Sequence, residues 1–70
     1  MKQITAIMAG VVVEIMVTPG VKVAIGQEVV MLESMKMQLP IPSELEGLVK
    51  EIRVKAGDFV NEGDPLIMLE

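Results

Sequence analysis

The sequence predicts an all-β domain, folded as a sandwich or flattened barrel built from two similar halves. The first observation behind this prediction is an internal repeat, in which Gly10 to Glu33 aligns with Gly47 to Glu70 at an offset of 37 residues without a gap. Eleven of the 24 aligned positions are identical, and all six glycines of the chain fall into pairs. Two copies of one unit in so short a chain predict an approximate two-fold axis.

The second observation is the spacing of the turn residues. Glycine, proline and other turn formers recur every few residues, and they divide the chain into short stretches that suit strands. No segment of eleven residues has the periodicity of an amphipathic helix, so we expect no helix. A sheet that closes or nearly closes on itself would hide the strand edges of so small a domain.

The predicted elements follow in the same order in both halves. An extended segment comes first, about Lys2 to Met8 in the first half and Met37 to Ile41 in the second. Pro40 and Pro42 place the second of these segments at a sheet edge or a strand end, because proline has no N–H to donate to a neighbouring strand.

Each copy of the repeat then opens with an alternating strand. Ile15 and Val17 are separated by residues of the other face, which is the period-two pattern of a strand with one buried side. Lys50, which aligns with Val13 in the repeat, is expected on the inward face and near a sheet edge. Turns follow at the remaining paired glycines, which are Gly20, Gly26, Gly57 and Gly63.

Each copy closes with four consecutive apolar residues. These runs are Val29 to Leu32 in the first copy and Leu66 to Leu69 in the second. Uninterrupted apolar runs of this length suggest strands that are covered on both faces.

The composition excludes several classes of function. The 70 residues include no cysteine and no histidine, so the chain has no thiolate, no imidazole base and none of the usual zinc ligands. We therefore expect no catalytic residue and no metal site. Ten acidic residues against six basic ones give a net charge of −4, which argues against nucleic acid as a partner. The longest uncharged stretch, Gln3 to Val13, is too short to span a membrane.

The junction between the two copies departs from the usual chemistry of a tight turn. The chain has to reverse at residues 34–37, because an extended run from Val29 to Ile41 would be too long for this domain. Two-residue hairpin turns favour Asn-Gly or Asp-Gly, since their central residues need φ > 0, and Met35 and Lys36 are costly in such positions. A tight turn that uses unfavourable residues with no evident stabilising contact is a candidate functional site.

Side-chain direction and the repeat both predict that Lys36 points to solvent at one pole of the molecule. In extended backbone, Met35 and Met37 would lie on one side and Lys36 on the other, toward solvent. Lys36 also aligns with a position just beyond the chain ends. We therefore expect the hairpin tip and the two termini at opposite poles of the molecule.

The residues of this junction resemble the attachment loop of biotinyl domains, whose usual core is Ala/Ser-Met-Lys-Met. Here the sequence is Glu33-Ser34-Met35-Lys36-Met37, preceded by four apolar residues and placed between the two copies of the repeat. The resemblance covers the whole chain. It implies the fold of biotinyl and lipoyl domains, in which two four-stranded antiparallel sheets pack as a flattened barrel (a barrel-sandwich hybrid).

The same resemblance implies a carrier function. Lys36 would be joined to biotin by an amide bond, and Met35 and Met37, with Glu33 and Ser34, would be recognised by a biotin protein ligase. The biotin would carry carboxyl groups between the active sites of a biotin carboxylase and a carboxyltransferase, so the chain itself would not be an enzyme.

The resemblance also implies the domain organisation. Residues 1–70 would form one biotinyl/lipoyl-type carrier domain, most like the short standalone biotin/lipoyl attachment proteins, although a domain of a larger carboxylase is the alternative. Met1 directly before the first strand favours a complete small chain. The interval from Gly10 to Glu33 leaves no room for the protruding thumb loop of some family members. We expect a monomer in the cytoplasm, with no membrane partner.

Other functions remain open at this point. A lipoyl carrier domain of a 2-oxo acid dehydrogenase-type system shares the fold but typically has Asp before the lysine and a small residue after it, whereas Met35 and Met37 stand here and favour biotin. A chain without the thumb could accept both cofactors. The chain could also be an unmodified interaction module on the same scaffold. Binding of Cu(I) by the two methionine thioethers is a weaker alternative, because no histidine or cysteine supports it.

Overall fold

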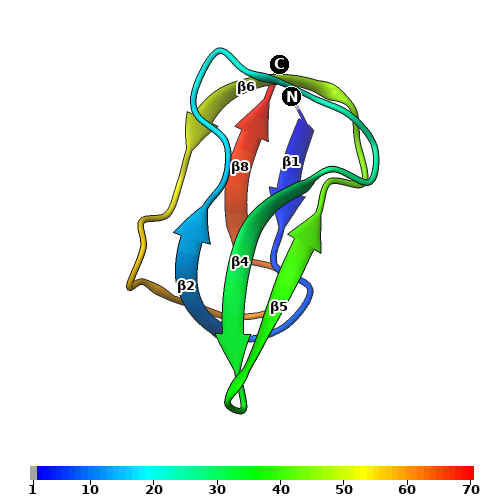
Figure 1. Cartoon of the computed structure of the whole chain (residues 1–70). Coiled ribbons are helices and arrows are strands. Elements are labelled where there is room, and N and C mark those ends of the chain that lie inside the picture. The colour runs from blue at the N-terminus through cyan, green and yellow to red at the C-terminus, as the bar shows by residue number, and fades with distance from the viewer. Residues whose placement is uncertain (1) are drawn as a thin grey trace.

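Eight strands make up the computed structural model, which describes residues 2–70 (Figure 1). No helix occurs in that range, as the sequence predicts, and therefore none that could span a membrane. The strands are β1 (Lys2–Thr5), β2 (Gly10–Ile15), β3 (Lys22–Val23), β4 (Glu28–Ser34), β5 (Met37–Pro42), β6 (Gly47–Ile52), β7 (Phe59–Val60) and β8 (Pro65–Leu69).

The strands form two four-stranded antiparallel sheets, which confirms the predicted fold. The strand order is β1-β8-β6-β3 in one sheet and β5-β4-β2-β7 in the other. Strand β5 pairs only with β4, so the segment that contains Pro40 and Pro42 lies at a sheet edge as expected. Strand β1 ends at Thr5 rather than near Met8, because the chain then bends across to the turn that precedes β8, where the Ala6 N–H donates to the Asp64 carbonyl at 2.9 Å.

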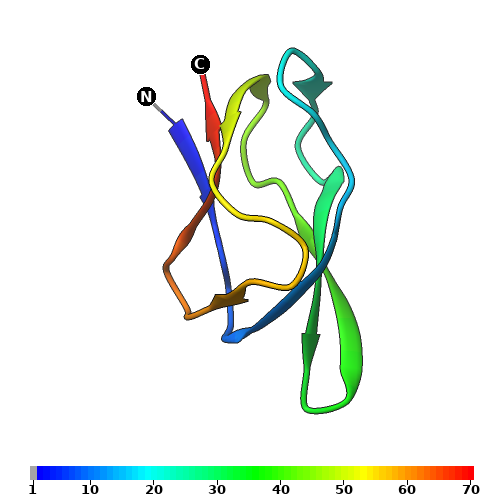
Figure 2. The same cartoon turned by 90° about the vertical axis from the view of Figure 1, so that its left-hand side faces the viewer.

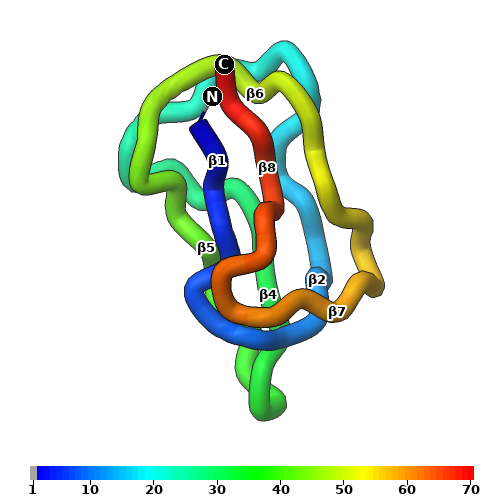
Figure 3. The backbone as a smooth tube through the Cα atoms, turned by 180° about the vertical axis from the view of Figure 1, so that it is seen from behind, coloured from blue at the N-terminus to red at the C-terminus, as the bar shows by residue number. Residues whose placement is uncertain are grey.

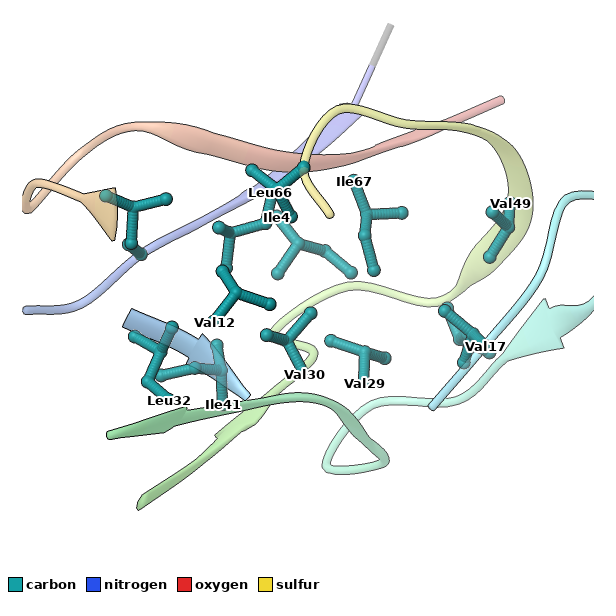
Figure 4. Close-up of a cluster of buried hydrophobic side chains, with 14 of the residues drawn as sticks. Ile4, Val12, Val17, Val29, Val30, Leu32, Ile41, Val49, Leu66 and Ile67 are labelled. Atoms are coloured by element: carbon teal, nitrogen blue, oxygen red, sulfur yellow. The ribbon is translucent and has the colours of Figure 1, made fainter. Parts of the chain in front are cut away.

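The core lies between the two sheets and consists of aliphatic side chains (Figure 4). Val12, Leu32 and Ile41 enter it from one sheet, and Leu66 and Ile67 enter it from the other. Burial of each such side chain stabilises the fold by about 1.5–3 kcal/mol. The buried apolar residues are Ile4, Ala6, Val12, Val17, Val23, Val29, Val30, Leu32, Ile41, Val49, Val54, Val60, Leu66, Ile67 and Leu69.

The hydrogen bonds of the backbone extend the internal symmetry beyond the aligned repeat. The Gly26 N–H donates to the Ser43 carbonyl at 2.7 Å, and the Gly63 N–H donates to the Ala6 carbonyl at 2.8 Å. Ala6 and Ser43 are separated by the same offset of 37 residues, and both are buried. The two halves are therefore related in their packing as well as in sequence.

Both inner strands of the repeat contain a β-bulge, which the sequence analysis missed. The pairing register shifts between Val12 and Glu14 in β2, and between Val49 and Glu51 in β6. The residue at the bulge is Val13 or Lys50, and both are exposed. The expected inward position of Lys50 is therefore wrong, because an extra residue in a bulge interrupts strict alternation. Lys50 lies on an inner strand, next to the short edge strand β3.

The two apolar runs are covered on both faces only in part. Met31 and Met68 are only half buried, while the other residues of each run are buried. Met31 lies between Glu14 of β2 and Pro40 of β5 on the outer face of its sheet, where no further layer of structure packs. Each run thus has a half-buried methionine on the outer face, whereas the two residues before that methionine are both fully buried.

Four turns place glycine at the same position, which confirms the predicted turn sites. In each turn the N–H of the fourth residue donates to the carbonyl of the first, and the third residue is a glycine with φ between +89° and +97°, as in a type II turn. The turns span residues 18–21, 24–27, 55–58 and 61–64.

Valine at any of these four glycines should lower the free energy of unfolding by about 1 kcal/mol or more. The cause is the backbone alone, because a Cβ placed at each glycine would meet nothing within 4 Å. Urea unfolding of Gly63→Val measures the loss. Glu62→Val in the same turn is the matched control and should unfold at the wild-type midpoint. Equal midpoints for all four glycine variants would contradict the turn assignment.

Candidate functional site

The hairpin between β4 and β5 projects from the body of the domain at one pole (Figure 2). The start of β1 and the end of β8 lie at the opposite pole, as expected from the repeat (Figure 3). A side chain at the hairpin tip is thus presented at the pole opposite the start of β1 and the end of β8. The tip consists of Met35 and Lys36, and the pair formed by Ser34 and Met37 closes it.

The two tip residues have left-handed backbone conformations. Met35 has φ of 52° and Lys36 has φ of 65°, and they are the only residues other than glycine with positive φ in residues 2–70. Positive φ at both central residues is the signature of a type I′ turn, whose twist matches that of the two strands. The reversal of the chain that was predicted at these costly residues is confirmed.

The side chains of the tip are displayed to solvent. Met35 is 92% exposed and Met37 is 60% exposed, and Lys36 is also exposed. Lys36 forms no salt bridge with any side chain of residues 2–70. The amine is therefore accessible to a partner molecule.

The expected alternation of Met35, Lys36 and Met37 assumed an extended backbone, and this assumption is wrong. Met35 and Lys36 have left-handed dihedral angles, for which the strand rule of opposite sides does not apply. The exposure of Lys36 follows from the projecting turn and not from alternation.

The two remaining predicted residues lie at the base of the hairpin. Glu33 is exposed and is paired across the sheet with Val11 on one side and Gln38 on the other. Ser34 is half buried and is paired with Met37. The structure thus brings residues 33–37 together as one continuous hairpin end.

Gly10 supports the hairpin base, a role that the sequence analysis did not identify. A Cβ atom at Gly10 would lie 2.7 Å from the backbone oxygen of Glu33 and 3.4 Å from Cβ of Ser34. Only glycine lets the start of β2 pass this close to β4. Its pairing with Gly47 in the repeat was visible in the sequence, but the close approach was not.

Nearly the whole chain matches one protein family. The family model for biotin/lipoyl attachment, described as "Biotin-requiring enzyme", matches residues 2–69. The chain belongs to the biotin/lipoyl attachment family. This confirms the resemblance drawn from the residues around Lys36.

Individual relatives in this family include both kinds of cofactor carrier. The chain is 52% identical over 62 residues to the biotin/lipoyl attachment protein of Bacillus subtilis, covering 89% of this chain and 85% of that one. It is 51% identical over 63 residues to the mitochondrial propionyl-CoA carboxylase alpha chain of Sus scrofa, covering 90% of this chain and 9% of that one. It is 46% identical over 61 residues to the dihydrolipoyllysine-residue acetyltransferase component of the pyruvate dehydrogenase complex of Pseudomonas aeruginosa. The match covers 87% of this chain and 11% of that one.

A solved structure has the same fold. The urea carboxylase of Kluyveromyces lactis matches with a TM-score of 0.90 at 25% identity, over 99% of this chain and 6% of that chain. The chain thus spans most of the Bacillus relative and only a small part of the large enzymes. It is an attachment domain of the biotin/lipoyl family.

Alanine at Gly10 should destabilise the domain by about 1–3 kcal/mol, because the new methyl group would overlap the backbone of β4. Urea unfolding measures the loss. Gly47→Ala is the matched control from the other half of the repeat, where a Cβ would lie 3.3 Å from the backbone oxygen of Glu70, the last residue of the chain. A loss for Gly47→Ala as large as that for Gly10→Ala would refute the special role of Gly10.

Asparagine at Met35 should raise the free energy of unfolding by about 0.5–1 kcal/mol, since asparagine tolerates the left-handed conformation better than methionine does. Thermal and urea unfolding measure the gain. Met37→Asn, which changes the neighbouring strand residue, should bring no gain. The assignment of the turn fails if both variants behave alike.

Proposed function

We propose that the chain is a biotin carrier domain that is biotinylated on Lys36. The observation that carries this proposal is the exposed Lys36 at the tip of a projecting turn, with methionine on both sides, in a chain of the attachment family. The loaded domain would move carboxyl groups between the active sites of a biotin carboxylase and a carboxyltransferase.

The chemistry of loading fits the residues of the tip. The Lys36 amine would attack the carboxyl carbon of a biotinyl-adenylate, forming an amide N–C bond as AMP leaves with the bonding electrons and the amine loses a proton. An exposed lysine amine is ordinarily protonated at neutral pH, and no salt bridge in residues 2–70 joins Lys36 to a carboxylate that could take its proton. We therefore expect the ligase to supply the base that takes the proton.

The position of Lys36 suits a carrier. The flexible four-carbon stem of lysine, lengthened by the valeryl chain of the cofactor, forms a long arm on a tip whose backbone the β4/β5 pairing holds in place. Tethering makes each delivery an intramolecular event at raised effective concentration. Bound biotin supplies the carboxyl-carrying ureido group, and the protein supplies placement and recognition.

Recognition by the biotin protein ligase would use the residues next to the lysine. Met35 and Met37 are exposed on both sides of Lys36, and Glu33 is exposed at the hairpin base. Ser34 would contribute through its position in the last strand pair, since its side chain is half buried. These four residues lie next to the lysine in one continuous hairpin end.

Lipoate is the second candidate cofactor, alone or in addition to biotin. The 46% identity to the acetyltransferase component of Pseudomonas aeruginosa supports this alternative, and so does the similarity to a Bacillus protein that is named for both cofactors. Met35 and Met37 favour biotin, because lipoyl domains typically have Asp before the lysine and a small residue after it.

The partners follow from the proposed cycle. We propose a biotin protein ligase, a biotin carboxylase and a carboxyltransferase, and we propose that the domain acts as a monomer in the cytoplasm. The absence of cysteine is compatible with a reducing compartment.

Incubation with biotin, ATP and a biotin protein ligase should add one biotin to the chain, as measured by intact mass spectrometry. Lys36→Arg should remain unmodified, while Lys50→Arg, an exposed lysine far from the tip, should be loaded like the wild type. The same assay with lipoate and a lipoate ligase tests the second candidate. Absence of any adduct with either ligase would refute the carrier proposal.

A further inference from the structure

A row of four side chains crosses the outer face of the sheet that carries the hairpin. Phe59 of β7 is paired with Val11 of β2, Val11 with Glu33 of β4, and Glu33 with Gln38 of β5. Residues directly opposite in a sheet share a face, so these four form one continuous surface, which we call the docking row. Figure 3 shows β7, β2 and β4 side by side in the half of the molecule that bears the hairpin.

Half of the docking row is apolar and exposed. Phe59 is the only aromatic residue of the chain, and it is 64% exposed on an edge strand. Val11 beside it is 40% exposed. The core does not use the phenyl ring, because the buried cluster contains only aliphatic side chains. Exposed aromatic residues of this kind are typical anchors of protein–protein interfaces.

The internal symmetry indicates that the fold does not require an aromatic residue at position 59. The counterpart of Phe59 in the first half of the repeat is Lys22, which is paired with Leu48 as Phe59 is paired with Val11. The same position in the same fold thus carries a charged side chain at the pole of the termini. Phenylalanine occurs only at the pole that carries Lys36.

The rim of the apolar half is acidic. Asp58 precedes Phe59, and Glu62 and Asp64 lie in the turn that follows β7. A shallow hollow beside Phe59 is lined in part by Asp58 and Asp64. Arg53, which also lines it, is already paired with Glu51 at 3.2 Å. An apolar patch bordered by carboxylates fits a partner that offers an apolar contact surrounded by lysine or arginine.

The docking row lies directly behind the attachment tip. Glu33 is two residues before Met35, which corresponds to about 7 Å along a strand. An enzyme that acts on the unmodified Lys36 amine has to approach the tip within the length of one lysine side chain, so its surface reaches Glu33. Val11 and Phe59 lie one and two strand spacings of about 4.8 Å beyond Glu33, within the width of an ordinary protein interface. Enzymes that act on the loaded, longer arm can stay further away.

We propose that the docking row, through Phe59 and Val11, binds the ligase that modifies Lys36. This inference rests on the proposed function. It adds Phe59 and Val11, the apolar half of the docking row, to the recognition residues 33–37. The partner is the biotin protein ligase. Its binding surface would offer an apolar contact for Phe59, and basic residues around that contact would face the carboxylates near Phe59.

Steady-state biotinylation kinetics test this proposal. Phe59→Ala and Val11→Ala should raise the KM for the carrier, about tenfold for Phe59→Ala, with kcat within twofold of wild type, because a docking contact is present both before and during the reaction. Leu48→Ala is the matched control, since Leu48 is 39% exposed at the equivalent position of the other pole. It should leave KM within twofold, and circular dichroism establishes that all variants fold.

The acidic rim gives a second readout. The KM of the wild type should rise with ionic strength, and Glu62→Gln should reduce this dependence. Glu62 suits this purpose because the side chains of Asp58 and Asp64 accept backbone N–H groups within their own turns, from Lys55 at 2.9 Å and Asn61 at 2.8 Å.

Nuclear magnetic resonance on Lys36→Arg with added ligase provides a test that needs no change in the row itself. Amide signals of Val11 and Phe59 should shift, and those of Lys22 and Leu48 should not. Unshifted row signals, or equal KM effects of Val11→Ala and Leu48→Ala, overturn the docking proposal even when Lys36 is still biotinylated. A wild-type chain that biotin ligase does not load would overturn the proposed function and this inference together.

Discussion

The left-handed backbone of the hairpin tip is the constraint on which the functional end of the molecule depends. Methionine and lysine at positive φ each cost about 1–2 kcal/mol relative to ordinary backbone. They persist at Met35 and Lys36 because six residue pairs join β4 to β5, and because Gly10 lets β2 pack closely behind the hairpin base. The lysine is therefore presented on a tight, supported turn and not on a flexible loop.

The internal repeat supports the hairpin in a chain of only 70 residues. Two equivalent halves share one aliphatic core and one set of glycine turns, and the junction between them becomes the hairpin. The equivalent place at the other pole is occupied by the chain ends. The fold thus has one distinct tip, and Phe59 stands in the half of the repeat where Lys22 is its counterpart.

Some features were predictable from local rules and others were not. Paired glycines predicted the turns, because a type II turn needs φ > 0 at one residue and glycine meets that need without strain. Prolines predicted the edge strand β5 through their missing N–H. Strict alternation failed at Val13 and Lys50, because a bulge depends on how two strands pair and not on either strand alone.

The sequence by itself determined the repeat, the all-β class and the position of the exposed lysine, because each depends on local conformational preferences or on the chemistry of single residues. Only the tertiary structure decided that Gly10 must be small and that Phe59, Val11 and Glu33 form one surface. Those relations join strands that are distant in the chain, and their geometry follows from the register and closeness of the packed strands. No local pattern in the sequence encodes that register.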